Sequence, residues 1–265
     1  MPEIKLSIII VSWNVGELLS KCLKSIYLYS LGLEIEVYVV DNASADGSAE
    51  MVKNNFPQVK LIASRENLGF AKANNLALKE ARGEYVLFLN PDTEIFPDTL
   101  NKSLAFMASH RDTGVMGCKM VYRDGSLQPS VRRFPTILAI LEMFLKLPKI
   151  FSRLRAIDHY LAKGFDYNRE QVVDQVMGAY MLIPKLVIEK VGLLDERFFT
   201  WFEEVDYCLR VKRASYRVYY NPEVKIIHHG GTSFAQAGMI KNQWRFFHSA
   251  LKYFLKNVFI SRILD

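Results

Sequence analysis

The sequence is poor in cysteine and contains no long apolar run. Its only three cysteines, Cys22, Cys118 and Cys208, lie far apart and form neither a metal-binding knuckle nor a disulfide framework, so we expect a reducing compartment, by default the cytoplasm. No stretch reaches the roughly 18 apolar residues that a membrane-spanning helix needs, and no secretory signal pattern precedes residue 14. These absences exclude a disulfide-stapled miniprotein and argue against a spanning helix.

Half of the 265 residues are apolar and 23% are charged, which is the composition of a globular protein with one large core. The net charge of +6 is concentrated in two segments. Residues 132–155 hold six Lys or Arg against one Glu, and residues 238–265 hold five against one Asp. The rest of the chain is therefore slightly acidic. Such local basicity indicates a surface partner, and we expect no nucleic-acid partner.

The first half of the chain alternates strand and helix signals. Continuous apolar runs predict buried parallel strands, and apolar residues at helical spacing between them predict helices. The predicted strands are 6–11, 35–41, 59–63 and 85–89, and the predicted helices are 17–29, 46–55 and 70–81. This series predicts an α/β fold with a doubly wound sheet, in which ligands bind at the carboxyl ends of the strands.

The second half is less regular. A basic, aliphatic insertion at 134–166 interrupts it, and we predict no form for that segment. The predicted helices are a short one after residue 184, 98–109, 203–214 and a tail from 239 onward. The predicted strands are 114–122, as one strand or two, 178–184, 216–220 and 224–227.

Polar residues follow three of the predicted strands. They are Ser12 and Asn14 after the first, Asp41, Asn42 and Ser44 after the second, and Asn90 and Asp92 after the fourth. Turn formation explains any one of these loops, because all these residue types favour turns. Three together at one sheet edge favour a binding site.

A divalent cation bound with a nucleoside diphosphate needs hard oxygen ligands and accepts an imidazole. Asp92 follows a buried strand, and His228 follows another apolar run, with His229 as the second choice. A helix cap or turn at Asp92 and an ordinary loop at His228 are the alternatives.

The third group of candidate residues is acidic and follows a run of aromatic residues. Glu203, Glu204 and Asp206 come directly after Trp201 and Phe202. Apolar rings and neighbouring anions raise the pKa of a carboxyl group, which suits a general base near neutral pH. The alternative is an ordinary acidic helix N-terminus.

Six motifs in this order resemble the inverting, nucleotide-sugar-dependent glycosyltransferases of family 2, and within them the bacterial rhamnosyltransferase-like branch. The motifs are SIIIVSWN at 7–14, VVDNASADGS at 39–48, ENLGFAKANN at 66–75, GEYVLFLNPDTE at 83–94, FFTWFEEVDYCLR at 198–210 and IIHHGGTS at 226–233. The resemblance implies a GT-A fold, with a mainly parallel mixed sheet flanked by helices. It implies one domain over 1–235, with a nucleotide-binding half to about 118, an acceptor half from 119 that contains the basic insertion 132–170, and a helix at 236–265.

The resemblance also implies roles for the donor-binding residues. Asp41 would hydrogen-bond N3 of uracil or thymine, and Ser12, Asn14, Asn42 and Ser44 would lie around the nucleoside. Gly69 would allow close backbone approach, and Asn74 would face the ribose or the diphosphate.

Metal ligands and catalytic groups follow from the same resemblance. Asp92 matches the last acid of the Asp-X-Asp metal motif, Asn90 replaces the first acid, and His228 matches the third ligand of Mg²⁺ or Mn²⁺. Replacement by Asn90 removes one negative charge. Glu204 aligns with the catalytic base, and Glu203 and Asp206 would support it, with Asp206 paired to Arg210.

The function so implied is inverting transfer of a sugar, for which dTDP-rhamnose is our hypothesis, to a glycan or polyprenyl-linked acceptor in cell-surface polysaccharide synthesis. A nucleotidyltransferase is less well supported, because no glycine-rich N-terminal loop with basic residues is present to hold a triphosphate. A non-catalytic nucleotide-sugar sensor or a membrane scaffold is the alternative from another class.

The C-terminal helix adds a membrane hypothesis. Lys241, Arg245, Lys252 and Lys256 fall within about 60° of one line along this helix, beside a broad apolar face. This pattern is typical of a helix that lies on anionic lipid, and residues 137–147 form a second candidate anchor. A peripheral position on the inner face of the cell membrane would follow. The alternative is an amphipathic helix docked on its own domain.

Overall fold

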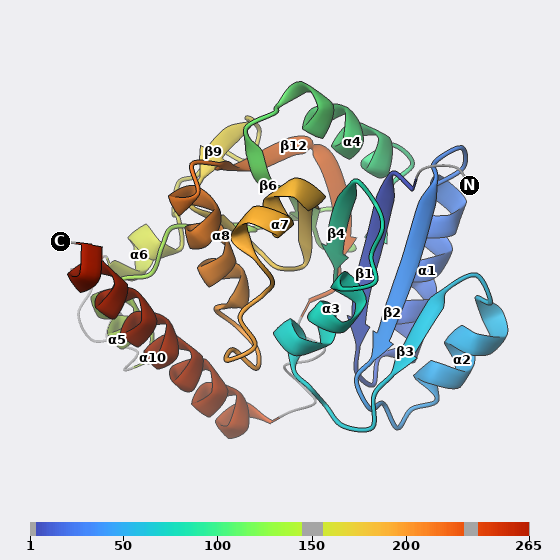
Figure 1. Cartoon of the computed structure of the whole chain (residues 1–265), viewed down its shortest axis with the longest axis horizontal. Coiled ribbons are helices and arrows are strands. Elements are labelled where there is room, and N and C mark those ends of the chain that lie inside the picture. Colours follow the sequence, from blue (N-terminus) through green and yellow to red (C-terminus); the bar gives the residue numbers. More distant parts are fainter. Residues whose placement is uncertain (1–3, 145–155, 231–237, 265) are drawn as a thin grey trace.

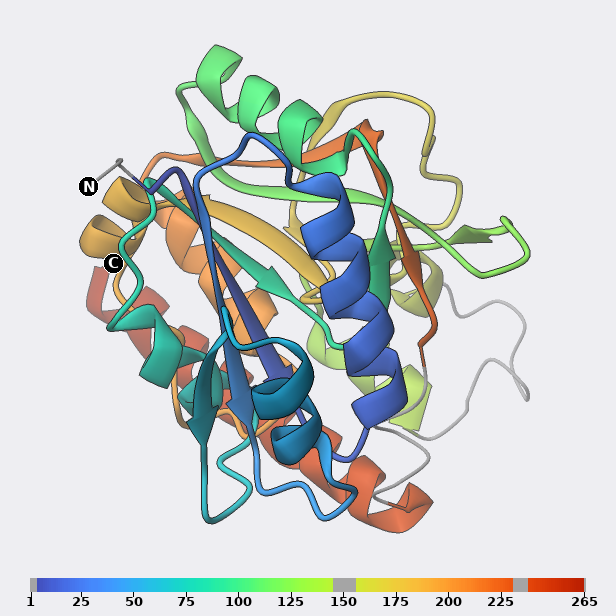
Figure 2. The same cartoon turned by 90° about the vertical axis from the view of Figure 1, so that its right-hand side faces the viewer.

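The computed structural model describes residues 4–144, 156–230 and 238–264. Within these residues the chain forms a ten-stranded sheet with helices on both faces, and a separate two-stranded ribbon (Figures 1 and 2). The strands are β1 (Leu6–Ser12), β2 (Ile35–Asp41), β3 (Lys60–Ala63), β4 (Tyr85–Leu89), β5 (Thr93–Ile95), β6 (Thr113–Val121), β7 (Leu127–Gln128), β8 (Val131–Arg132), β9 (Gln171–Val173), β10 (Gln175–Val176), β11 (Tyr180–Pro184) and β12 (Arg217–His228). The helices are α1 (Gly16–Tyr29), α2 (Ser48–Asn55), α3 (Phe70–Leu78), α4 (Thr99–Ser109), α5 (Ile137–Phe144), α6 (Ala156–Tyr160), α7 (Lys185–Val191), α8 (Glu203–Arg213) and α10 (Met239–Leu264).

The first half of the sheet is parallel, in the order β3-β2-β1-β4. β1 and β4 lie inside the sheet, and nearly all their residues are buried because they are apolar on both faces. The α/β alternation predicted for residues 6–89 is confirmed, with element ends shifted by up to three residues. The carboxyl ends of β1, β2 and β4 consequently meet at one edge.

The second half makes the sheet mixed. β11 runs antiparallel between β4 and β6, and β12 runs parallel to β6. The prediction of two short strands at 216–220 and 224–227 is wrong, because β12 is one strand with a register shift between Asn221 and Lys225. Pro222 lies inside this irregularity and cannot donate a ladder hydrogen bond, so the chain bulges there and then resumes its pairing.

Two apolar layers cover the two faces of the sheet. On one face, Ile8 and Ile10 of β1 pack in a cluster with residues of α1, α2 and α4, and Figure 2 shows α1 in blue across this face. On the other face, Ile9 of β1 packs in a cluster with residues of α3, α7 and α8. The alternation of side-chain direction along β1 thus feeds both layers.

The C-terminal helix α10 is docked on the domain. Its Ala250 and Tyr253 pack with Ile140 of α5 and with Phe202 and Val205, at the start of α8. Among the described residues no helix is both long enough and apolar enough to cross a membrane.

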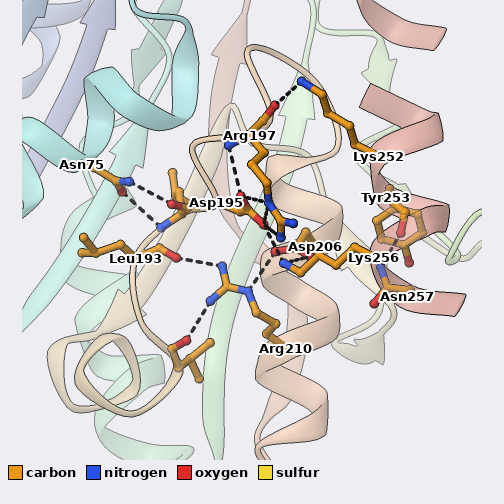
Figure 3. A network of polar contacts seen from close by, with 12 residues as sticks. Asn75, Leu193, Asp195, Arg197, Asp206, Arg210, Lys252, Tyr253, Lys256 and Asn257 are labelled. Atoms are coloured by element: carbon orange, nitrogen blue, oxygen red, sulfur yellow. Dashed lines mark hydrogen bonds and ion pairs between the residues drawn. The ribbon is translucent and has the colours of Figure 1, made fainter. Parts of the chain in front are cut away.

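The docked face of α10 includes part of its basic stripe. Lys256 forms ion pairs with Asp195 and Asp206, and its side chain is only 13% exposed (Figure 3). Lys252 donates to the backbone oxygen of Arg197. Lys252 and Lys256 of the basic stripe thus contact the protein itself, as the alternative of a helix docked on its own domain implies. The outer face of α10 instead exposes Trp244, Leu251 and Leu255, and these side chains are 45–63% exposed.

Candidate active site

A pocket of about 460 Å³ opens where β1, β2 and β4 end. Predicted residues from both halves of the chain line it, including Asn42, Gly69, Asn90 and Asp92 from the first half. Glu203, Glu204 and His228 line it from the second half. The fold thus brings the three predicted groups, which are distant in the sequence, into one cavity.

Asp92 and His228 lie side by side in this pocket. Nε2 of His228 is 3.4 Å from Oδ1 of Asp92, and both side chains are 8% exposed. They come together because β12 pairs antiparallel with β5, which places His228 opposite Thr93. Nδ1 of His228 is 2.7 Å from Oε1 of Gln128, a residue that sequence reasoning missed. This contact fixes the orientation of the ring and leaves Nε2 toward Asp92.

His229, the second choice, is directed elsewhere. Its Nε2 lies 2.8 Å from Oε1 of Glu94, and it does not line the pocket. Successive side chains of an extended chain point to opposite sides, which explains why only one histidine of the pair faces Asp92.

Asp92 and His228 fit a divalent cation that is also held by substrate. Within the described ranges, no cluster of three or more His, Cys, Asp or Glu could hold a metal by itself. Mg²⁺ and Mn²⁺ commonly take one or two carboxylates and complete their shell with phosphate oxygens and water. Asn90, which matches the first acid of the metal motif, also lines the pocket and carries an amide in place of a carboxylate.

Two buried oxygens lie beside the carboxyl ends of β1 and β2. Ser12 Oγ and Asp41 Oδ1 are buried, and neither has a hydrogen-bond partner among the described residues. The other carboxylate oxygen of Asp41 accepts from the backbone N–H of Ser44 at 3.1 Å. Burial of an unsatisfied acceptor is costly, so this arrangement suits a ligand that donates a hydrogen bond.

Asn14 and Ser44 join the first two strand-end loops. Ser44 Oγ accepts from the backbone N–H of Asn14 at 2.9 Å, and Asn14 Oδ1 accepts from Ala45 N–H at 2.7 Å. These contacts hold the loops in register with each other. In this structure both residues shape the walls and lie outside the main pocket lining.

Asn42 and Gly69 line the pocket, and hydrogen bonds tie the loop around Gly69 to Asn42. The Asn42 amide donates to Asn67 Oδ1 and to the Gly69 carbonyl, and its oxygen accepts from Leu68 N–H. Gly69 has φ +77°, and a Cβ added there would lie 2.2 Å from the carbonyl oxygen of Phe199. Gly69 therefore permits a close backbone approach, as predicted, but the approaching group is the loop before α8.

Like Ser12, Asn14, Asp41 and Ser44, the predicted residues Asn74 and Asp206 lie outside the pocket lining. Asn74 is buried in α3 and donates to the backbone oxygen of Phe70 at 2.9 Å. Asp206 is 1% exposed and is bound to Arg210 at 2.9 Å, the pairing that was predicted, and to Lys256. Figure 3 shows this carboxylate within the network between α8 and α10. Its role in this position is structural, because its ion pairs hold α8 against α10.

Glu203 and Glu204 form a carboxyl pair in which Glu203 is buried and Glu204 is half-buried. Burial raises the pKa of both, and the charge of Glu204 raises that of Glu203 further. Arg132 lies near Glu204 and lowers the pKa of that carboxyl. One oxygen of each group has no hydrogen-bond partner among the described residues. These effects favour the neutral form of Glu203 more strongly than that of Glu204, so Glu204 is the better candidate for the base.

A strained turn places this pair. Trp201 and Phe202 have φ of +62° and +71°, a region that bulky side chains rarely adopt. Phe246 of α10 contacts both rings, and Tyr253 contacts Phe202. Aromatic packing against α10 holds the turn, and with it the position of Glu203 and Glu204.

Further pocket residues were missed in the sequence. They include Trp13, Asn67, Arg132, Tyr160, Gln175, Phe199 and Arg245. Arg132 and Arg245 belong to the two basic segments, so local charge was the available signal. The charge pattern did not reveal which of the basic residues line the pocket.

A sequence model described as "Glycosyl transferase family 2" matches residues 7–177. The chain belongs to this family. Its matched region contains Asp41 and Asp92, whereas Glu204, His228 and α10 lie beyond it. The relationship predicted from the six motifs is confirmed.

Curated relatives of this family 2 chain include rhamnosyltransferases. An N-acetylglucosaminyl-diphospho-decaprenol L-rhamnosyltransferase of Mycobacterium tuberculosis is 27% identical over 237 residues, covering 84% of this chain and 76% of that protein. Rhamnosyltransferase WbbL of Escherichia coli is 28% identical over 207 residues, covering 72% of this chain and 69% of that protein. These similarities support a glycosyltransferase of cell-surface glycan synthesis.

Solved structures show the same fold. Mannosyltransferase PcManGT from Pyrobaculum calidifontis, in complex with GDP-Man and Mn²⁺, has a TM-score of 0.64 at 20% identity and is matched over 94% of this chain. Staphylococcus aureus TarS 1–349 with UDP-GlcNAc has a TM-score of 0.58 at 21% identity, over 89% of this chain. This chain spans 64% and 62% of those structures. The predicted GT-A fold is thus confirmed.

Proposed function

We propose that this family 2 glycosyltransferase transfers a sugar, with inversion, from a UDP- or dTDP-linked donor to a hydroxyl of a lipid-linked acceptor. L-rhamnose is the proposed sugar, because two relatives are named for its transfer. The observation that carries the proposal is one pocket that holds both the Asp92–His228 pair and the base candidate Glu204. The use of a polyprenyl-linked acceptor is supported by the name of the mycobacterial relative.

The donor half, to about residue 118, would bind the nucleoside. Asp41 Oδ1 is the buried acceptor proposed to take the N3–H of uracil or thymine, an edge that both bases share. Ser12 Oγ and the Asn42 loop would complete this side. Bound nucleoside would satisfy oxygens that otherwise remain buried and unpaired.

Catalysis would rest on charge at two places in the pocket. Asp92 and His228 would hold Mg²⁺ or Mn²⁺, which supplies positive charge against the leaving nucleoside diphosphate. Glu204 would accept the proton of the attacking hydroxyl, and Glu203, protonated, would remain neutral beside it. A single displacement by that hydroxyl inverts the anomeric carbon.

The acceptor half, residues 119–235, would present the acceptor to Glu204. Arg132 and Tyr160 both line the pocket near Glu204. The charge of Arg132 lowers the pKa of Glu204, and the charge of Glu204 raises the pKa of Tyr160. A cation and a hydroxyl beside the base suit a polar sugar acceptor whose carrier has phosphate groups.

The protein would lie on the inner face of the cell membrane. The exposed apolar side chains of α10 are Trp244, Leu251 and Leu255, and α5 exposes Ile137, Leu138 and Leu141. The two helices share one apolar cluster through Ile140 and Ala250. An exposed apolar surface of this kind suits the interfacial region of a bilayer that carries a lipid-linked acceptor.

The test compares Glu204→Gln with Glu203→Gln as a matched control. Glu204→Gln should reduce transfer by about a thousandfold or more while UDP or dTDP binding is kept, because only the base is lost. Glu203→Gln mimics the protonated neighbour and should keep activity within about tenfold. Transfer is measured by sugar incorporation, and binding by the shift in melting temperature with nucleotide and Mg²⁺ or Mn²⁺.

Two results would contradict this function. Equal activity in the two variants would remove Glu204 as the base. Nucleotide-sugar binding with no transfer by the wild-type protein under any acceptor would favour the non-catalytic sensor.

A further inference from the structure

Arg245 is a cation of the pocket that the proposed reaction does not use. It lies in the second turn of α10, outside the part of the chain that matches the family. Its guanidinium stacks on the ring of Phe199, 4.3 Å from the ring centroid, and its side chain is half-buried. Figure 1 shows the start of α10 at the same end of the molecule as the carboxyl ends of the parallel strands.

No carboxylate in the described part of the chain neutralises this guanidinium. Across the described ranges, Arg245 forms no ion pair, and burial, the sole cause of its shifted pKa, lowers that pKa. The segment 231–237, which immediately precedes α10, contains neither Asp nor Glu. On this side of the helix, Lys252 donates to the backbone oxygen of Arg197, and Lys256 forms ion pairs with Asp195 and Asp206. A partly desolvated cation without a counter-charge is unfavourable unless a ligand supplies the charge.

The contacts of Phe199 place Arg245 on the donor side of the pocket. The carbonyl oxygen of Phe199 accepts from Phe70 N–H at 2.7 Å, at the start of α3. It also lies against Gly69, whose own carbonyl accepts from Asn42. Arg132, the other pocket arginine, lies beside Glu204 and thus on the acceptor side.

We propose that Arg245 binds the diphosphate of the nucleotide donor, so that the C-terminal helix contributes directly to the donor site. A planar guanidinium offers paired N–H donors to phosphate oxygens, and stacking on Phe199 orients it beforehand. This inference rests on the proposed use of a nucleoside-diphosphate sugar. It gives α10 a second task besides packing against the turn before Glu203.

Calorimetric titration with UDP and dTDP, in the presence of Mg²⁺, tests this role. Arg245→Gln should raise the Kd for the diphosphate about tenfold to a hundredfold, because a charge-assisted contact is lost. Arg245→Lys keeps the positive charge but loses the paired N–H donors of the guanidinium, so its Kd should lie between those of the wild type and Arg245→Gln. Lys241→Gln, an exposed change one turn earlier, should alter Kd by less than about twofold. Binding of uridine or thymidine, followed by saturation-transfer NMR, should be equal in all four proteins.

Each other outcome has a separate meaning. If the wild type binds UDP or dTDP and Arg245→Gln binds it equally well, the role of Arg245 is overturned and the proposed function stands. If Arg245→Gln keeps donor affinity but raises KM for a phosphate-bearing acceptor, the donor-side assignment is overturned. If the wild type binds neither nucleotide, the proposed function fails, and this inference fails with it.

Discussion

At the scale of single residues, burial decides what the carboxyl groups of this pocket can do. Glu203 and Glu204 have raised pKa values because the turn after Trp201 removes them from water. Asp195 is also partly buried, and burial by itself would raise its pKa. Its contacts with Arg197 and Lys256 outweigh that effect and hold the pKa well below the ordinary value. The same residue type therefore serves as a proton acceptor in one place and as a permanent anion in another.

Glu203→Gln should stabilise the protein increasingly as pH rises. Above about pH 4.3 the unfolded chain releases the Glu203 proton, whereas the folded protein keeps it until its raised pKa, so wild-type stability falls with pH over that window. The amide of glutamine does not ionise in this pH range, so the variant lacks this loss of stability. The melting temperature of the variant relative to wild type should rise by at least about 2 °C between pH 5 and pH 8. A constant difference across this range would show that Glu203 is ionised in the folded state.

At the scale of elements, the docking of α10 depends on an ion-pair network within the protein. Lys256 lies between Asp195, in the loop before α8, and Asp206 of α8, and Arg210 completes the network (Figure 3). The Asp206 side chain is 1% exposed, so its charge must be compensated inside the protein. Sequence periodicity showed which residues share a face of α10, but it could not show which face turns inward.

Lys256→Met should lower the free energy of unfolding by about 3 kcal/mol, because it leaves two partly or fully buried carboxylates short of a cation. Lys252→Met is the matched control, since Lys252 is exposed and contacts only a backbone oxygen. Its effect should stay within about 0.5 kcal/mol. Urea unfolding followed by circular dichroism measures both. Similar losses in the two variants would show that the network does not stabilise α10.

At the scale of the whole molecule, the outward face of α10 and α5 defines how the protein would meet a membrane. Basic residues that were predicted to attract anionic lipid are partly used for internal pairing, so apolar contact becomes the larger expected contribution. The segment 145–155, which includes the end of the predicted second anchor at 137–147, lies outside the described residues.

The triple variant Trp244→Glu, Leu251→Glu, Leu255→Glu should reduce co-sedimentation with phosphatidylglycerol vesicles by at least about tenfold, because the inserted apolar area is lost. Leu31→Glu, at an exposed leucine of the loop after α1, controls for added charge and should bind vesicles nearly as wild type does. Transfer to a water-soluble acceptor should be unchanged in both. Undiminished vesicle binding by the triple variant would place the membrane contact elsewhere.

The sequence by itself determined the alternation of strands and helices over residues 6–89 and the family, and it predicted that Asp92, Glu204 and His228 lie in one site, because local patterning and short motifs are written in consecutive residues. Only the tertiary structure decided that Asn74 and Asp206 turn away from the pocket and that Arg245 turns into it. Such choices depend on how α3, α8 and α10 rotate about their axes as they pack. That rotation is set by contacts between residues that are far apart in the chain, such as Phe202 with Tyr253 and Asp206 with Lys256.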